Sequence, residues 1–343
     1  MAFIHTPLSF YILRFLLGAA EAGFFPGIVY YLTGWAPAAH RARLIGLFMT
    51  AIPLSTAFGA PISSFILSLN GAFGLSGWRW LFLVETVPSL ALGCATLMWL
   101  HDQPGQAAWL TTEEKAWLTR TLEAERSNRP AHARALLQTL VHPRVLALGF
   151  CYFGAEIGLY GVILWLPQIL QNLGVSSANA GWAVAGPYAL AAAVMVLWCR
   201  HSDRTRERVW HIAIASAVAC AGLAASAYAP HSAVLSLTAI TFGVVGTLAI
   251  LPVFWTLPTA LLDGAAAAGA IALINALGNI GGFVGPFVVG WIKDRTGSYA
   301  PGLLVIAGCV LMTGIIALIV GHDSEAEYGE DAVQAAPARA TKP

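Results

Sequence analysis

The stretch RFLLGAAEAGFFPG, residues 14–27, places two charges inside a segment that is otherwise apolar. The surrounding run, 8–32, is long enough to cross a bilayer, which takes about 20 mostly apolar residues. A charge at the centre of a bilayer costs at least ~2.5–3.5 kcal/mol on insertion scales, so Arg14 and Glu21 need a compensating environment. A water-filled cavity within a bundle of membrane helices would provide one.

The composition of the whole chain indicates an integral membrane protein. Of its 343 residues 58% are hydrophobic and only 10% are charged, and the mean hydropathy is +0.71. Soluble domains contain roughly 25% charged residues, so this chain has too few to cover a surface that faces water. The apolar runs are continuous rather than alternating, which favours helices over a β-barrel. The net charge of +1 gives no indication of a nucleic-acid partner.

Nine apolar runs have the length of a transmembrane helix, which predicts an all-α membrane protein. Lys and Arg gather in alternate loops, which by the positive-inside rule places the C-terminus in the cytoplasm and the N-terminus outside. The approximate runs are 8–32, 44–69, 79–100, 146–170, 179–199, 209–229, 233–256, 268–292 and 302–321.

A polar loop, 101–144, separates the first three runs from the last six. We expect 1–100 to be a partial N-terminal half, 145–321 a complete six-helix half, and 322–343 a disordered cytoplasmic tail. The central loop itself lies on the cytoplasmic side under the same charge rule.

Two Gly/Pro motifs support this division, because FGAPIS (58–63) and VGPFVVG (284–290) lie six runs apart. That spacing is typical of transporters built from two six-helix halves. Within the central loop, Thr111 and Glu114 have the spacing of a capping box. They predict a short amphipathic helix on the membrane face or against the cytoplasmic ends of the bundle.

Five segments, in chain order, resemble the major facilitator superfamily and, more narrowly, its anion:cation symporter family. They are similar to that family's fourth helix, the start of its sixth, its central loop, its loop between helices eight and nine, and its eleventh helix. The segments are RFLLGAAEAGFFPGIVYYLTGWAP (14–37), GWRWLFLVETVPSLALG (77–93), QAAWLTTEEKAWL (106–118), RHSDRTRERVWH (200–211) and AAAAGAIALINALGNIGGFVGPFVVGWIKDRTGSY (265–299). The resemblance implies a major facilitator fold in which 1–100 holds the equivalents of helices four to six. We therefore expect the first three helices to be lacking.

The resemblance also implies a function: a secondary active transporter that carries a small organic anion together with a proton by alternating access. Sugar acids, hydroxy-dicarboxylates and aromatic carboxylates are the substrates it suggests, across a bacterial-type inner membrane. Sodium coupling stays open, and so do a non-transporting sensor and a truncated, non-functional fragment. We expect a monomer surrounded by membrane lipid, with no nucleic acid and no cofactor beyond the coupled H⁺. An enzyme is not indicated, because HExxH, GxSxG and phosphate-loop motifs are absent.

Arg14 and Glu21 are seven residues apart, almost two turns, so they share one helix face about 10 Å apart along the axis. That separation is too long for an ordinary ion pair along a helix. The resemblance implies that this face borders the substrate cavity, where Glu21 carries the proton and Arg14 attracts the anion. The alternative is a structural role in which the charges tie helices together.

A second polar face lies in run 146–170, where Tyr152, Glu156 and Tyr160 follow one another at intervals of four. This stripe could line the cavity, or Glu156 could simply be hydrogen-bonded within the bundle. Asn275 and Asn279 have the same spacing in a glycine-rich run. Their amides could donate to an anion or join two helices.

The loop after run 179–199 contains four charged residues that we expect to form a gating clamp, broken during alternating access. The alternative is positive-inside charge alone. These residues are Asp203, Arg204, Glu207 and Arg208.

Two further residues have two open interpretations each. Glu85 could form a structural hydrogen bond or have a functional role, and Trp255 could pack within the bundle or contact the ligand. We predict no metal site or disulfide, because Cys94, Cys151, Cys199, Cys220 and Cys309 lie in apolar runs without ligand spacing.

Overall fold

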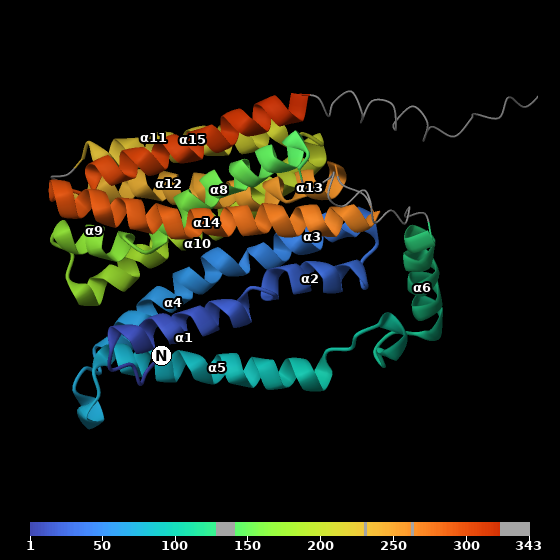
Figure 1. Ribbon diagram of the computed structural model, residues 1–343, viewed down its shortest axis with the longest axis horizontal. Helices are drawn as coiled ribbons and strands as arrows, with labels where there is room; N and C mark the ends of the chain where they lie inside the picture. The colour runs from blue at the N-terminus through green and yellow to red at the C-terminus, as the bar shows by residue number, and fades with distance from the viewer. Residues whose placement is uncertain (128–140, 230–231, 262–263, 323–343) are drawn as a thin grey trace, which may run out of the picture.

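The protein is described by a computed structural model that covers residues 1–127, 141–229, 232–261 and 264–322 (Figure 1). Every regular element in these ranges is a helix, which confirms the predicted all-α class. Eight of the helical stretches in the same ranges are long and apolar enough to span a membrane. They correspond to the last eight of the nine predicted runs.

The first predicted run, 8–32, is broken, so the count of nine is not confirmed. It consists of α1 (Pro7–Glu21) and α2 (Phe24–Thr33), with lengths of 15 and 10 residues. Each is shorter than the roughly 20 residues that a membrane crossing takes. The break has a local cause. Gly23 has low helix propensity, and Pro26 lacks the N–H that would bond to the carbonyl group of Ala22.

The next elements are α3 (Ala38–Met49), α4 (Ala51–Leu67) and α5 (Gly77–Trp99). A tight turn joins α4 to α5, and in it Gly71 has φ +90° and Gly74 φ +72°, values that favour glycine. Ser63 of α4 donates a hydrogen bond of 2.6 Å to Glu85 of α5. Glu85 therefore has a structural contact, which is one of the two roles left open for it.

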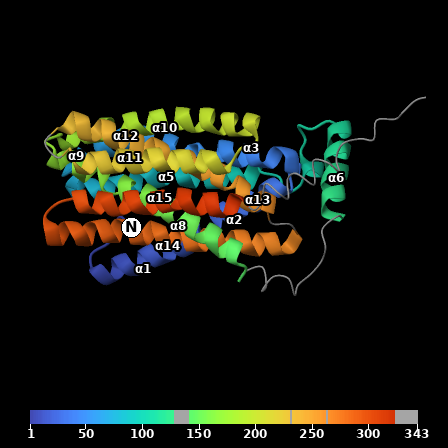
Figure 2. The ribbon, with the colours of Figure 1, turned by 90° about the horizontal axis from the view of Figure 1, so that it is seen from above.

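Helix α6 (Thr112–Ser127) forms within the central loop, where the capping box predicted a helix. The backbone N–H of Thr111 donates to Glu114 over 2.9 Å, and the Glu114 N–H donates back to the Thr111 hydroxyl over 3.3 Å. In Figures 1 and 2, α6 lies beyond the end of the bundle and across its long axis. Trp109, just before α6, stacks on Trp35 with ring centroids 5.9 Å apart, which ties this loop to the end of α2.

The rest of the described chain is a bundle in which α8 packs between α14 and α15, and α11 between α12 and α15. Helix α10 packs on α12 and also on α4, so it joins the two parts of the molecule (Figure 1). The elements are α8 (Pro143–Ile163), α9 (Leu166–Asn172), α10 (Ser177–Thr205), α11 (Val209–Ala227), α12 (Ala233–Phe254), α13 (Thr256–Leu261), α14 (Gly264–Thr296) and α15 (Ala300–His322).

Glycines let α8 and α14 approach closely. A Cβ at Gly285 would lie 2.8 Å from the carbonyl oxygen of Ile157, and one at Gly281 would overlap the carbonyl oxygen of Phe153. Membrane helices pack mainly through such close backbone contacts, since lipid provides no hydrophobic drive between them. The glycine-rich run therefore sets the distance between the two helices that carry five of the predicted site residues.

Candidate functional site

The polar stripe on α8 changes from buried to half-open along its length. Glu156 is only 4% exposed, and Tyr152 is similarly buried, whereas Tyr160 is 40% exposed. The phenol of Tyr152 interacts with the carboxyl group of Glu156 and with the indole of Trp255. Glu156 is thus a buried acid with a phenol one helical turn away, as its spacing predicted.

An aromatic cluster holds Tyr152 in place. Its ring stacks on Phe254 with centroids 5.2 Å apart and planes 8° apart, and it meets Trp255 edge-on at 5.0 Å. Trp255 lies where α12 ends, and it also contacts Phe25 of α2 at 5.1 Å. Trp255 therefore has a packing role, which is one of the two roles left open for it. Phe25 was not singled out in the sequence, where only its position four residues after Glu21 could have drawn attention to it.

Helix α14 lies against the same stripe through two more glycines. A Cβ at Gly278 would overlap the Tyr152 ring, and one at Gly282 would lie 2.9 Å from the Tyr160 ring. The two predicted asparagines flank Gly278 but differ in environment, because Asn275 is buried and Asn279 is exposed. The structure therefore buries Asn275 and leaves Asn279 exposed, although their spacing along the helix is that of one turn.

Tyr160 connects the predicted residues of the two parts of the chain. Its phenol is within electrostatic range of Glu156 on its own helix and of both Glu21 and Arg14 on α1. Arg14 and Glu21 are exposed. In the described part of the chain they form no ion pair with each other, as their separation predicted. The Tyr160 phenol is thus within electrostatic range of charged groups on two separate helices, α1 and α8.

The predicted gating clamp forms contacts within one turn. Arg208 pairs with Asp203 at 2.7 Å and donates to the Ser202 hydroxyl at 2.9 Å. Glu207 accepts from the backbone N–H of Trp210 at 3.1 Å, while Arg204 is exposed. These contacts join the end of α10 to the start of α11. The gating role stays a prediction.

No group of three or more His, Cys, Asp and Glu side chains among the described residues could hold a metal ion. The five cysteines are all free thiols. The candidate site consists of carboxyl, phenol, amide and guanidinium groups on the helices of a polytopic membrane protein, and three of its residues, Tyr152, Glu156 and Asn275, are buried.

Comparison with known proteins places the chain more narrowly. A Major Facilitator Superfamily model matches residues 1–286. A protein of Agrobacterium vitis, provisionally named a tartrate transporter, is 48% identical over 94% of this chain and 72% of its own length. A quinolone resistance transporter of Acinetobacter baumannii is 37% identical, over 93% of this chain and 74% of its own. The chain belongs to the major facilitator superfamily, whose members are transporters and not enzymes.

The fold agrees with that assignment. The proton:xylose symporter XylE superposes with a TM-score of 0.61 at 19% identity, over 86% of this chain and 66% of that one. At this identity the likeness concerns the fold alone. The protein is thus a multi-pass membrane transporter with a major facilitator fold.

Proposed function

We propose that the protein transports a small organic anion together with protons, as in the anion:cation symporter family. Tyr160 is the main support, since its phenol lies within range of charged groups on α1 and of Glu156 on α8. A transporter that alternates between two states needs one substrate site to which both parts of the molecule contribute residues. The name of the Agrobacterium vitis relative supports a carboxylate as the substrate.

In this proposal each polar group has a role that its chemistry allows. Arg14 attracts the anion, and Glu21 binds and releases the coupled proton. The Tyr152 and Tyr160 hydroxyls and the Asn275 and Asn279 amides donate hydrogen bonds to carboxylate oxygens.

The two acidic groups have a consequence for charge balance. A dicarboxylate entering with one proton would still carry one negative charge against an inside-negative potential. Moving that charge costs ~2.3 kcal/mol per 100 mV. Protons on both Glu21 and Glu156 would neutralise the dianion, so a dicarboxylate should enter with two protons and a monocarboxylate with one.

Export is the second candidate, because the Acinetobacter baumannii relative is named for quinolone resistance. The fold sets no direction of transport, so the same site could load an anion from either side. The orientation that we propose, with the C-terminus and the α6 loop in the cytoplasm, rests on the distribution of Lys and Arg.

The test is uptake into proteoliposomes of labelled tartrate, a sugar acid and an aromatic acid, with and without an imposed inward proton gradient. We expect the gradient to drive uptake and Glu21→Gln to abolish that drive. Glu85→Gln is the matched control, because Glu85 is also an intramembrane carboxylate but bonds to Ser63.

If the rate of uptake changes neither with the proton gradient nor with Glu21→Gln, proton coupling is contradicted and facilitated diffusion is left as the mechanism. Quinolone efflux without uptake of any acid would favour the second candidate. A chain that moves none of these compounds would match a sensor or an inactive fragment.

A further inference from the structure

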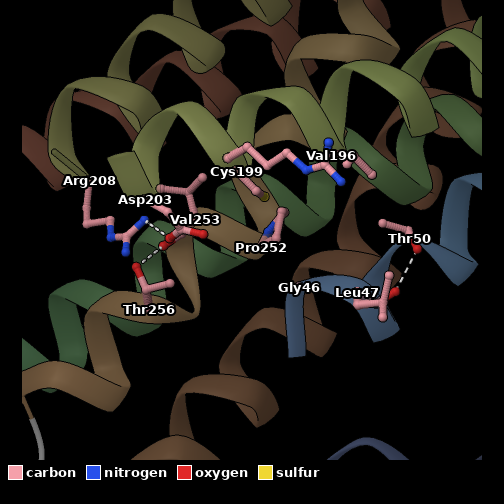
Figure 3. Close-up of a pocket in the computed structure, with 11 residues that line it drawn as sticks. Gly46, Leu47, Thr50, Val196, Cys199, Asp203, Arg208, Pro252, Val253 and Thr256 are labelled. Carbon is pink, nitrogen blue, oxygen red and sulfur yellow. Dashed lines mark hydrogen bonds and ion pairs between the residues drawn. The ribbon is translucent and has the colours of Figure 1, made fainter. Parts of the chain in front are cut away.

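A cavity of about 150 Å³ lies between α3, α10 and α12, apart from the stripe around Glu156 (Figure 3). It is at the end of the bundle that the charge distribution places in the cytoplasm. Leu47 and Thr50 enter from the N-terminal side of the molecule, and Val253 from the C-terminal side. The volume is about ten times the ~10–15 Å³ that a single water needs, so a small organic molecule can fit.

One cation that lines the cavity has no acidic partner among the residues that the structure describes. Arg208 is paired with Asp203, so that these two charges cancel. Arg200 also lines the cavity, and within the described residues it forms no ion pair. A free guanidinium presents a planar fork of N–H donors that matches the two oxygens of a carboxylate.

The remaining wall is mostly apolar. Leu47, Val196 and Val253 contribute aliphatic side chains. The Thr50 hydroxyl already donates to the Leu47 carbonyl over 2.6 Å, and that of Thr256 donates to the Val253 carbonyl over 2.6 Å. Few donors are thus left to satisfy a molecule rich in hydroxyl groups, since an unpaired buried polar group is costly.

We propose that this cavity is a second anion site, for a compact carboxylate with an apolar body, such as an aromatic monocarboxylate. Arg200 receives the carboxylate, and the body lies between the α3 residue Leu47 and the α12 residue Val253. A ligand there holds the two sides of the molecule together at this end. If the proposed transport function is correct, that ligand slows transport, because alternating access requires the two sides to separate there.

Cys199 provides the test, because its thiol lines the cavity. In a variant with Cys94, Cys220 and Cys309 changed to alanine, the reactive thiol is Cys199, since Cys151 is fully buried. The measurement is the rate of maleimide labelling of Cys199 in detergent, with benzoate as the probe. Occupancy lowers that rate by 1 + [L]/Kd, which is about tenfold at ten times Kd.

We expect Arg200→Gln to lose protection by benzoate. Arg206→Gln is the matched control and should keep it, because Arg206 is an exposed cation six residues away that does not line the cavity. Labelling of both variants without benzoate reports whether the cavity is intact. Tartrate should protect less than benzoate in every variant.

The proposal is overturned if benzoate gives no protection, or if it protects Arg200→Gln and Arg206→Gln equally. Protection by phosphatidylglycerol micelles alone, with none from benzoate, would also overturn it and indicate a lipid site. Failure of this proposal is distinguishable from failure of the transport proposal. Protection without any uptake would leave the second site standing, and uptake without protection would leave only the transport function.

Discussion

Helix α5 of residues 1–100, the N-terminal region, and helix α8 of residues 143–322, the C-terminal region, are similarly apolar but are buried to very different extents. Helix α5 has slightly higher hydropathy than α8 in its most apolar stretch, yet none of that stretch is buried, compared with 67% for α8. Helix α1 has no buried residue at all. Hydropathy therefore marks which segments enter the membrane, and packing partners decide which side chains become interior.

Individual glycines of the two regions show the same contrast. A Cβ at Gly18, Gly59 or Gly93 would meet no atom within 4 Å, whereas one at Gly281 or Gly285 would meet the α8 backbone. The same residue type thus has a packing role only where a second helix lies against it. A helix contact requires matching surfaces on both helices, because lipid solvates an apolar side chain as well as a neighbouring helix does.

The largest effect should come from breaking the α8–α14 contact. Gly281→Val places a branched side chain against the Phe153 carbonyl, and such overpacking typically costs about 1–3 kcal/mol. Gly93→Val on α5 is the control and should leave stability unchanged or slightly higher, because no atom lies nearby. The measurement is the midpoint of thermal unfolding in detergent. Equal losses in both variants would mean that the two regions pack alike.

A smaller effect should follow from removing one hydroxyl. Tyr152→Phe keeps the stacked ring but loses the interaction with Glu156, and a typical hydrogen bond contributes about 0.5–1.5 kcal/mol. Tyr11→Phe on α1 is the control, because that side chain is 67% exposed. Denaturant unfolding in detergent should separate the two variants. The same destabilisation from Tyr11→Phe would contradict the contrast between buried and exposed regions.

The smallest effect should be the pH response of α6, which belongs to neither region. Hydrogen bonds from the backbone and side chain of Thr111 hold the pKa of Glu114 below its usual value of 4.5. The cap is therefore fully stabilising above that value and weakens as pH falls through the lowered pKa. Hydrogen exchange at the start of α6 should accelerate over this acidic range.

Glu114→Gln should remove that pH dependence, and Glu113→Gln should preserve it, since Glu113 does not accept the Thr111 hydrogen bonds. Acceleration of the same size in Glu114→Gln would show that another group titrates.

The contrast between exposed and buried helices extends to the candidate site. Glu21 and Arg14 are exposed on α1, whereas Glu156 is buried on α8, and Tyr160 is within range of all three. Sequence spacing correctly predicted that Tyr152 and Glu156 would meet and that Arg14 and Glu21 would not pair. It could not predict that Asn275 and Asn279, which have identical spacing, would end in different environments. That outcome depends on how α14 is turned against α8.

The sequence alone determined the all-α class, eight of the spans, the α6 cap and the spacing of the charged residues. Each depends on the length of an apolar run or on the local helix repeat, which a chain carries without reference to distant residues. The tertiary structure alone decided that α8 and not α5 is buried, and that Phe25 meets Trp255. It alone opened a cavity beside Arg200. These features require segments far apart in the chain to present complementary surfaces, and no local pattern encodes that complementarity.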